Sequence, residues 1–234
     1  MSTNPATFVL VHGGWWAGDW WWKDVAQPLR AAGHSVYTPV LTGLGPRSHL
    51  LSPDVDLSTH ILDIANLIKW EELDNIVLVG HSYAGMVISG VAENVPEGII
   101  RSIVYLDAFF PEDGQSVADF FPPEALEAII GKDDPVPPPN WFGGDNAALT
   151  ALLTKGGTPH PRAALFEPAR LTGARDRIAK KTYVLAATNP GGNADTARKL
   201  RADPSWTVEE IDCGHMTMID APKETAEILL RAIP

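Results

Sequence analysis

The segment from Ile76 to Gly85 constrains the fold of this chain more than any other. The run Ile-Val-Leu-Val at 76–79 is typical of a buried strand, and Val87 and Val91 begin an apolar face of helical spacing. A serine, Ser82, lies at the junction. Where a strand turns sharply into a helix, the corner residue is strained and its side chain projects from the sheet. The segment therefore predicts an α/β fold with a presented serine hydroxyl.

Small residues flank this serine at the spacing that such a corner requires. Gly80 and Ala84 lie two residues before and two after Ser82, so the pattern G-x-S-x-G is met with alanine in its last place. An alternative is that Ser82 is the N-cap of an ordinary helix, which is common in α/β folds. The buried strand before it and the helix after it favour a nucleophile.

Strands and helices alternate along most of the chain. We expect further strands at 8–11, 35–38, 103–106, 183–187 and 206–211, and helices at about 20–32, 61–68 and 221–233. Alternation of this kind predicts a mostly parallel sheet with helices on both faces. The length of 234 residues and the hydrophobic share of 45% fit one globular domain.

The alternation breaks between residues 111 and 175, where prolines are frequent. Only short helical patches are expected there, at 123–130 and 146–153. The segment is too long for a simple connection in a compact domain. We therefore predict a lid at 111–175, inserted into a core made of residues 1–110 and 176–234.

A serine nucleophile needs a base that is itself held by a third group. His215 is the best candidate, because it follows the last predicted strand within Cys-Gly-His-Met at 213–216 and could reach back to Ser82. His81 adjoins the serine and is expected to point away from it. His34 and His160 are interpreted as ordinary loop or surface residues.

The oxyanion of a tetrahedral intermediate needs backbone N–H donors fixed in advance. Tyr83 supplies the N–H directly after the serine, and Gly14 lies in the loop His-Gly-Gly at 12–14 after the first strand. Glycine permits the close approach that such a donor requires. The alternative is that this loop is only a tight turn.

These features together resemble one group of α/β-hydrolases, which contains plant methylesterases (salicylate-type esterases), hydroxynitrile lyases and bacterial relatives. The resemblance runs nearly end to end and rests on residues 8–14, 33–34, 79–82, 105–111 and 214–216. It implies the α/β-hydrolase fold. Lyases of this group tend to carry threonine at the position of Gly13 and lysine at that of Met216. The esterase-like pair found here implies hydrolysis; a lyase, a cofactor-free oxygenase using His215 as base, and a non-catalytic receptor are the alternatives.

The acid of the triad departs from the pattern of these relatives. In the family an aspartate usually follows the strand at 183–187, but this chain reads Thr-Asn-Pro-Gly-Gly at 188–192. Asp107 ends the strand after the serine corner, at the sheet edge where functional side chains collect. We favour it over Asp195, the carboxylate nearest to the usual place. A helix cap or a salt bridge under the lid is the alternative role for Asp107.

Aromatic side chains surround the predicted site and favour an apolar or aryl substrate group. Gly13, Trp15, Phe109, Trp141 and Met216 are the expected substrate-binding residues, although such aromatic residues equally form lid cores. We expect a serine esterase that cleaves small neutral carboxylic esters through an acyl-enzyme. Related amide, carbamate and lactone bonds are open to the same groups.

Composition bears on partners and location. The net charge of −11 without long charged runs disfavours nucleic acid and anionic membranes as partners. No apolar stretch approaches the ~18 residues of a membrane span, and no signal peptide is expected. The single cysteine, Cys213, fits a reducing compartment, so a cytoplasmic location is predicted. No metal-ligand cluster or dinucleotide fingerprint is found, so no cofactor or metal is expected; a homodimer is one option for the assembly.

Overall fold

The computed structural model describes residues 5–139, 146–189 and 193–234. Its strands are β1 (Thr7–Val11), β2 (Ser35–Tyr37), β3 (Ile76–His81), β4 (Ile100–Leu106), β5 (Lys180–Ala186) and β6 (Trp206–Ile211). They form one six-stranded sheet in the order β2-β1-β3-β4-β5-β6, and every neighbouring pair is parallel. The predicted parallel α/β sheet is therefore confirmed.

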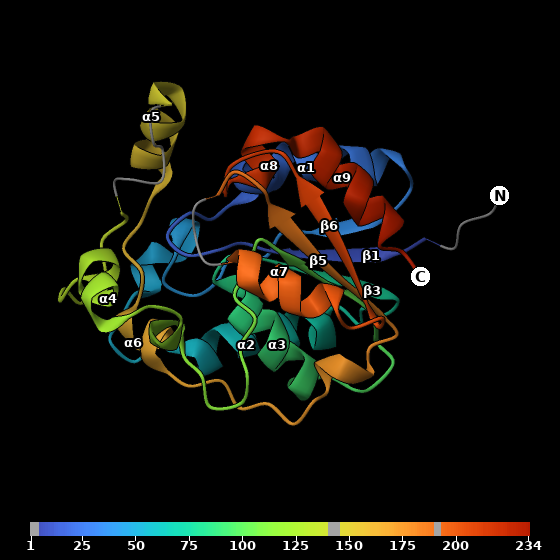
Figure 1. Ribbon diagram of the computed structural model, residues 1–234, viewed down its shortest axis with the longest axis horizontal. Helices are drawn as coiled ribbons and strands as arrows, with labels where there is room; N and C mark the ends of the chain where they lie inside the picture. The colour runs from blue at the N-terminus through green and yellow to red at the C-terminus, as the bar shows by residue number, and fades with distance from the viewer. Residues whose placement is uncertain (1–4, 140–145, 190–192) are drawn as a thin grey trace.

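Helices cover both faces of the sheet (Figure 1). The helices of the core are α1 (Asp19–Ala31), α2 (Leu57–Trp70), α3 (Ala84–Asn94), α7 (Asn193–Arg201), α8 (Thr217–Asp220) and α9 (Pro222–Arg231). Helices α1 and α9 pack together on one face, and α2 and α3 pack together on the other. Among the described residues, no helix is long and apolar enough to cross a membrane.

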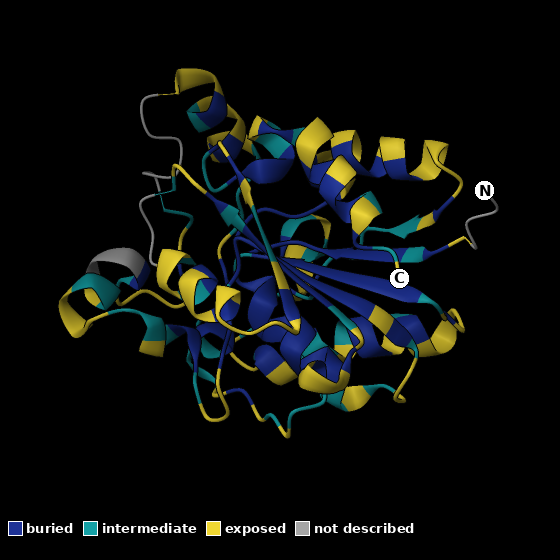
Figure 2. Ribbon diagram, turned by 45° about the vertical axis from the view of Figure 1, so that its right-hand side comes forward, coloured by how far each residue is buried: buried dark blue, intermediate teal, exposed yellow. Residues whose placement is uncertain are grey.

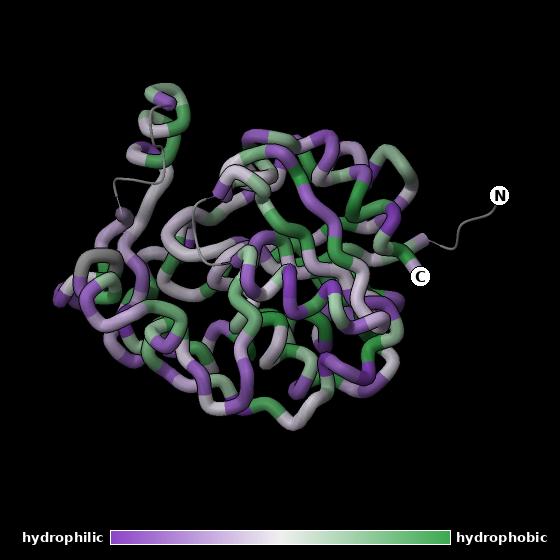
Figure 3. Tube along the Cα trace, in the orientation of Figure 1, coloured by the Kyte–Doolittle hydropathy of each residue, from purple (hydrophilic) through white to green (hydrophobic). Residues whose placement is uncertain are grey.

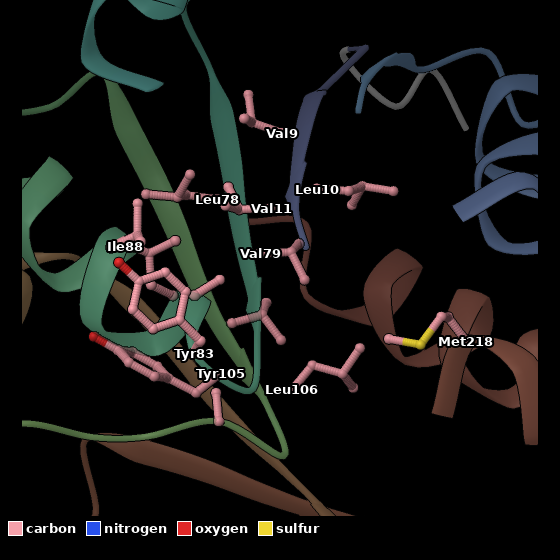
Figure 4. Packing of buried hydrophobic residues seen from close by; sticks show 14 of the residues in the cluster. Val9, Leu10, Val11, Leu78, Val79, Tyr83, Ile88, Tyr105, Leu106 and Met218 are labelled. Carbon is pink, nitrogen blue, oxygen red and sulfur yellow. The ribbon is translucent and has the colours of Figure 1, made fainter. Parts of the chain in front are cut away.

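The centre of the sheet is the hydrophobic core, as the buried strands in Figure 2 show. Successive strand side chains point to opposite faces, so both faces carry apolar residues that helices cover. Leu10 and Met218 lie on one side of the sheet, and Leu78 and Tyr105 lie on the other (Figure 4). The covering helices alternate between polar and apolar residues, as expected for helices with one buried face (Figure 3).

The ends of several elements differ from the sequence prediction because of polar residues. Strand β4 begins at Ile100, and Arg101 at its second position is exposed. Strand β5 includes Lys181, which is buried because its ammonium group donates to the carbonyl oxygens of Asp176 and Ile178. Because strands are predicted from runs of apolar residues, polar residues at the start of a strand make the predicted strand too short.

The segment between residues 111 and 175 lies at the carboxyl edge of the sheet (Figure 1). It contains α4 (Pro123–Ile130), α5 (Ala147–Gly156) and α6 (Arg162–Phe166). The predicted helices at 123–130 and 146–153 are confirmed by α4 and α5, whereas α6 was not anticipated because it is little longer than one turn. Whether this segment acts as a lid stays a prediction.

Arg175, at the end of this segment, forms a hydrogen bond with Pro111, at its beginning. Its buried guanidinium donates to the carbonyl oxygen of Pro111 at 2.6 Å and lies over the ring of Phe110, 3.8 Å from the ring centroid. A guanidinium stacked on an aromatic face is held by cation–π attraction as well as by its hydrogen bonds. The segment therefore leaves and rejoins the core at one fixed point.

Candidate active site

Ser82 occupies a strained corner between β3 and α3. Its φ of 54° is in the left-handed region, which non-glycine residues rarely adopt. The corner depends on close contact with its neighbours. A Cβ at Gly80 would lie 2.8 Å from the carbonyl oxygen of Ala84, and one at Gly85 would lie 1.9 Å from that of Phe109. Glycine is thus required at both positions, and the requirement at Gly85 falls one residue beyond the sequence pattern.

The structure brings Ser82, His215 and Asp107 into one hydrogen-bonded chain. The Nε2 atom of His215 lies 2.9 Å from the Oγ atom of Ser82, and its Nδ1 atom lies 2.6 Å from the Oδ2 atom of Asp107. Asp195, the alternative acid, is instead exposed on α7 and pairs with Arg198. Of the two candidate acids, the structure therefore places only Asp107 beside His215.

The carboxylate of Asp107 is completely buried at the end of β4. Burial opposes its ionisation, but hydrogen bonds from His215, Asn193 and Asn189 and the charge of His215 outweigh this and hold its pKa below the ordinary value. An ionised Asp107 accepts the Nδ1–H of His215. The Nε2 atom of His215 is then left as an acceptor for the hydroxyl of Ser82.

Gly14 and Tyr83, whose backbone amides are the predicted oxyanion donors, lie close to each other. A Cβ at Gly14 would lie 4.0 Å from the Cβ of Tyr83. In the part of the chain that the structure describes, neither N–H donates to a protein acceptor. Both are thus available to an oxyanion, as the sequence predicted for this pair, although their catalytic use stays a prediction.

Gly13 presses directly against the nucleophile. A Cβ at this position would lie 3.0 Å from the Cβ of Ser82 and 3.0 Å from the Nδ1 of His81. Contacts this short are rare for a real Cβ atom, so a larger side chain here would require the serine or the imidazole to shift by a few tenths of an ångström. Glycine, at the position that distinguishes the two activities in the predicted family, packs against the nucleophile without requiring such a shift.

Comparison with known proteins agrees with this geometry. The profile of the alpha/beta hydrolase family matches residues 8–228. A carbendazim hydrolyzing esterase of Nocardioides sp. is 39% identical over 241 residues, covering 96% of this chain and 98% of the relative. The chain belongs to the alpha/beta hydrolase family. It is a hydrolase of the esterase group within it.

Two further relatives extend the comparison. Methylesterase 7 of Arabidopsis thaliana is 28% identical over 256 residues, which cover 98% of this chain and 96% of the relative. Among solved structures, an extracellular alpha/beta-hydrolase from a Paenibacillus species superposes with a TM-score of 0.83 at 32% identity, covering 97% of this chain and 99% of that one. The predicted resemblance to plant methylesterases and bacterial esterases is therefore confirmed.

Four further histidines surround the triad of this hydrolase, and one of them, His12, braces the oxyanion loop. Its Nδ1–H donates to the carbonyl oxygen of Gly13 at 2.8 Å, and its Nε2 accepts the N–H of Leu41 at 3.0 Å. Burial lowers the pKa of His12 to about 4, so the ring is neutral near pH 7. Sequence reasoning assigned it no role, because its partner at Leu41 is distant in the chain.

His60 holds the side chain of Tyr83. The Nε2–H of His60 donates to the carbonyl oxygen of Thr42 at 2.9 Å, which leaves Nδ1 to accept the phenol O–H of Tyr83 at 2.8 Å. Burial lowers the pKa of His60, so this tautomer is maintained near neutral pH. The residue that offers one oxyanion donor is thus fixed through its side chain.

His160 and His34, predicted to be ordinary loop or surface residues, do lie outside the helices and named strands, but neither is a surface residue. His160 is completely buried, and its ring lies 4.7 Å from that of Tyr83 and 5.6 Å from that of Trp15. The segment at 111–175 brings His160 against the oxyanion loop, and no local sequence pattern predicts this contact. His34 is also buried, and its Nδ1 accepts the N–H of Ala6 where β1 and β2 begin.

The tryptophans after the oxyanion loop connect it to the segment at 111–175. The indole N–H of Trp15 donates to the carbonyl oxygen of Val136 at 3.1 Å, and that of Trp16 donates to Leu153 at 2.8 Å. The carbonyl oxygen of Trp15 accepts the N–H of Thr158 at 3.0 Å. The segment and the oxyanion loop are therefore one hydrogen-bonded unit.

Apart from Trp141, the other residues expected to bind substrate are close in the chain to the triad or to the oxyanion loop and are among the described residues. Trp15 and Met216 are buried and directly follow Gly14 and His215 in the chain, and the backbone N–H of Phe109 donates to the carbonyl oxygen of Ser82 at 3.1 Å. Trp141 lies outside the described residues. Contact of these side chains, and of Gly13, with a substrate stays a prediction.

Cys213 lies two residues before the base but is not suited to be a nucleophile. Burial, with nearby carboxylates contributing, raises the pKa of its thiol to about 12. Within residues 5–139, 146–189 and 193–234, no group of three or more histidine, cysteine or acidic side chains is placed to hold a metal ion.

Proposed function

We propose that this hydrolase cleaves small neutral carboxylic esters with an apolar or aryl group through an acyl-enzyme on Ser82. The observation that carries the proposal is the hydrogen-bonded chain from Ser82 through His215 to Asp107. Two unoccupied backbone N–H groups beside it, those of Gly14 and Tyr83, complete the requirements of acyl transfer.

The reaction has two balanced halves. As the Oγ of Ser82 attacks the ester carbonyl, the Nε2 of His215 takes its proton and the carbonyl oxygen becomes an oxyanion held by Gly14 and Tyr83. His215 then gives the proton to the departing alkoxide, and the alcohol leaves. Water attacks the acyl-enzyme by the same route, releasing the acid and restoring the serine. Asp107 stabilises the imidazolium formed in each half.

The surroundings of the triad favour neutral substrates over charged ones. Trp15 and Met216 are buried apolar residues that directly follow Gly14 and His215, and Phe109 packs against the rings of Phe120 and Phe121. Apolar and aromatic walls with few fixed polar groups are typical of sites for small uncharged molecules. We therefore place aryl or short alkyl esters first.

Carbamates are a second candidate substrate class. The relative that is 39% identical over nearly the whole chain is a carbendazim hydrolyzing esterase, and carbendazim is a carbamate. A carbamate carbonyl can be attacked by the same serine, giving a carbamoyl-enzyme in place of an acyl-enzyme. The lyase alternative is less favoured, because this chain has Gly13 and Met216 where such lyases tend to carry threonine and lysine, and a Cβ at residue 13 would lie only 3.0 Å from the Cβ of Ser82.

A substrate panel tests the proposal. Phenyl acetate, methyl benzoate, a methyl N-arylcarbamate and mandelonitrile would be assayed with the wild type, with Ser82→Ala and with Ser102→Ala. Ser102 is a matched control, because its hydroxyl is buried in β4 and has no hydrogen-bond partner among the described residues. Loss of ester cleavage in Ser82→Ala alone is expected.

Different outcomes of the panel separate the alternatives. Labelling of Ser82 by a fluorophosphonate probe, found by peptide mass, should accompany ester cleavage. Preferred turnover of the carbamate would select the second substrate class. Undiminished hydrolysis by Ser82→Ala, or release of cyanide from mandelonitrile as the main activity, would overturn the proposal.

A further inference from the structure

The imidazole directly before the nucleophile takes no part in the reaction proposed above. His81 ends β3, and only 2% of its surface is exposed. Its Nε2 atom lies 2.9 Å from the backbone carbonyl oxygen of His215. Because a carbonyl oxygen can only accept, Nε2 carries the proton and donates it. The residue next to the nucleophile is therefore bonded to the backbone of the base.

The ring of His81 is also in contact with the ring of His215. The two ring centroids lie 4.6 Å apart, with an angle of 40° between the planes. On the opposite edge, the Nδ1 atom of His81 faces Gly13, where a Cβ would lie 3.0 Å away. Within the described residues this nitrogen has no hydrogen-bond partner. The ring is wedged between the loop of the base and the oxyanion loop.

This hydrogen bond connects parts of the chain that are far apart in sequence. His81 and His215 are separated by 134 positions. The loop that carries His215 begins after β6 and is held at its start by a bond from the N–H of Thr188 to the carbonyl oxygen of Cys213. Besides the bond between the side chains of His215 and Ser82, the bond from His81 connects the backbone of this loop to the corner that carries Ser82.

We infer that His81 is a positioning residue for the base: its Nε2–H holds the backbone of His215 so that the imidazole of His215 reaches Ser82. The inference rests on the proposed function, since it concerns the same proton transfer. A nucleophile and a base that are misplaced by about 1 Å can lose roughly 100-fold in rate. His81 would thus act on turnover while touching neither substrate nor reacting atoms.

Three variants separate donation by Nε2 from simple packing. His81→Gln keeps an amide N–H at a reach similar to that of Nε2, whereas His81→Asn offers the same group too close to the backbone. His81→Leu removes the donor and keeps an apolar side chain. For each variant, kcat and KM for phenyl acetate, the labelling rate of Ser82 by a fluorophosphonate and the melting temperature would be measured.

A matched control comes from the other end of the sheet. His34 is likewise a buried histidine with a hydrogen bond to backbone, in this case from the N–H of Ala6 at 3.1 Å. His34→Leu should lower the melting temperature and leave kcat unchanged. It therefore measures what general destabilisation alone does to the assay.

We expect His81→Leu and His81→Asn to lose about 100-fold in kcat and in labelling rate with little change in KM. His81→Gln should stay within a few-fold of the wild type. The inference is overturned if Leu or Asn keeps wild-type kcat, or if Gln is impaired as severely as Asn. If His81→Leu does not fold, the comparison of kcat between His81→Gln and His81→Asn still tests the inference. Failure of the proposed function is distinguishable, because it appears as activity in Ser82→Ala.

Discussion

The side-chain amide of Asn189, at the end of β5, donates a 2.7 Å hydrogen bond to the carboxylate of Asp107, at the end of β4. The same amide nitrogen lies 3.4 Å from the Nδ1 of His215. Two neighbouring strands thus each present a polar residue to the same imidazole. Only one of them is a carboxylate, and it occupies the strand nearer to the serine corner.

Replacing Asp107 by asparagine should lower kcat by about 10⁴-fold, because an amide at this position holds His215 in the wrong tautomer. Steady-state kinetics on phenyl acetate would measure this. The geometry of Asn189 permits a stronger test. The double variant Asp107→Ala with Asn189→Asp places a carboxylate within reach of Nδ1 from the second strand and should recover part of the lost rate. Near-normal turnover in Asp107→Asn would remove this carboxylate from the mechanism.

Alanine substitutions at the two glycines of the oxyanion loop should differ in their effect on kcat. At Gly13 a Cβ would lie 3.0 Å from Ser82, so Gly13→Ala should displace the nucleophile and cost about 100-fold in kcat. At Gly14 the nearest atom, in the ring of His160, would be 3.4 Å away, which is ordinary contact. Gly14→Ala should therefore retain activity within a few-fold. Equal losses in the two variants, with melting temperatures as the check on folding, would contradict this packing.

Removal of the phenol hydroxyl of Tyr83 should affect stability more than turnover. Tyr83→Phe leaves the Nδ1 of buried His60 without its donor, a loss that typically costs about 1–3 kcal/mol. The backbone N–H of residue 83 is retained, so kcat should change little. Urea unfolding would measure the expected loss of stability, and steady-state kinetics on the same preparation would check that kcat is nearly unchanged. A large fall in kcat at unchanged stability would show that the hydroxyl acts in the reaction itself.

The parts of this molecule that the sequence predicts are those set by local pattern. The strand and corner around Ser82 follow from four consecutive apolar residues and flanking small residues, and His215 follows from its place after the last strand. Asp107 could be ranked above Asp195 because a strand end at the functional edge of the sheet is a local feature too.

What the sequence does not reveal is set by contacts between distant segments. His160 comes to the site only because the segment at 111–175 folds back over Trp15, and that segment is rich in proline with little periodicity. His60 and Asn189 gain their roles from partners elsewhere in the chain, such as Tyr83 and Asp107. Nothing in the neighbouring residues distinguishes them from ordinary polar positions.

The neutral histidines around the site should make the fold sensitive to mild acid. Burial lowers the pKa of His12 to about 4 and that of His81 to about 3. In the unfolded chain each would titrate near its ordinary value of about 6.5. Between these values the unfolded state binds protons that the folded state does not, so stability falls as the pH falls.

The size of this effect can be measured directly. Well below pH 6.5 the slope for each such histidine approaches about 1.36 kcal/mol per pH unit, so that for the pair approaches about 2.7 kcal/mol per unit. His60 and His160 act in the same direction, since burial lowers the pKa of each. Urea unfolding at pH 7, 6.5, 6 and 5 should show a loss of stability that is small in the first half-unit and steeper thereafter. A free energy of unfolding that stays constant from pH 7 to pH 5 would contradict this prediction. It would mean that these imidazoles take up protons in the folded state and are not held neutral.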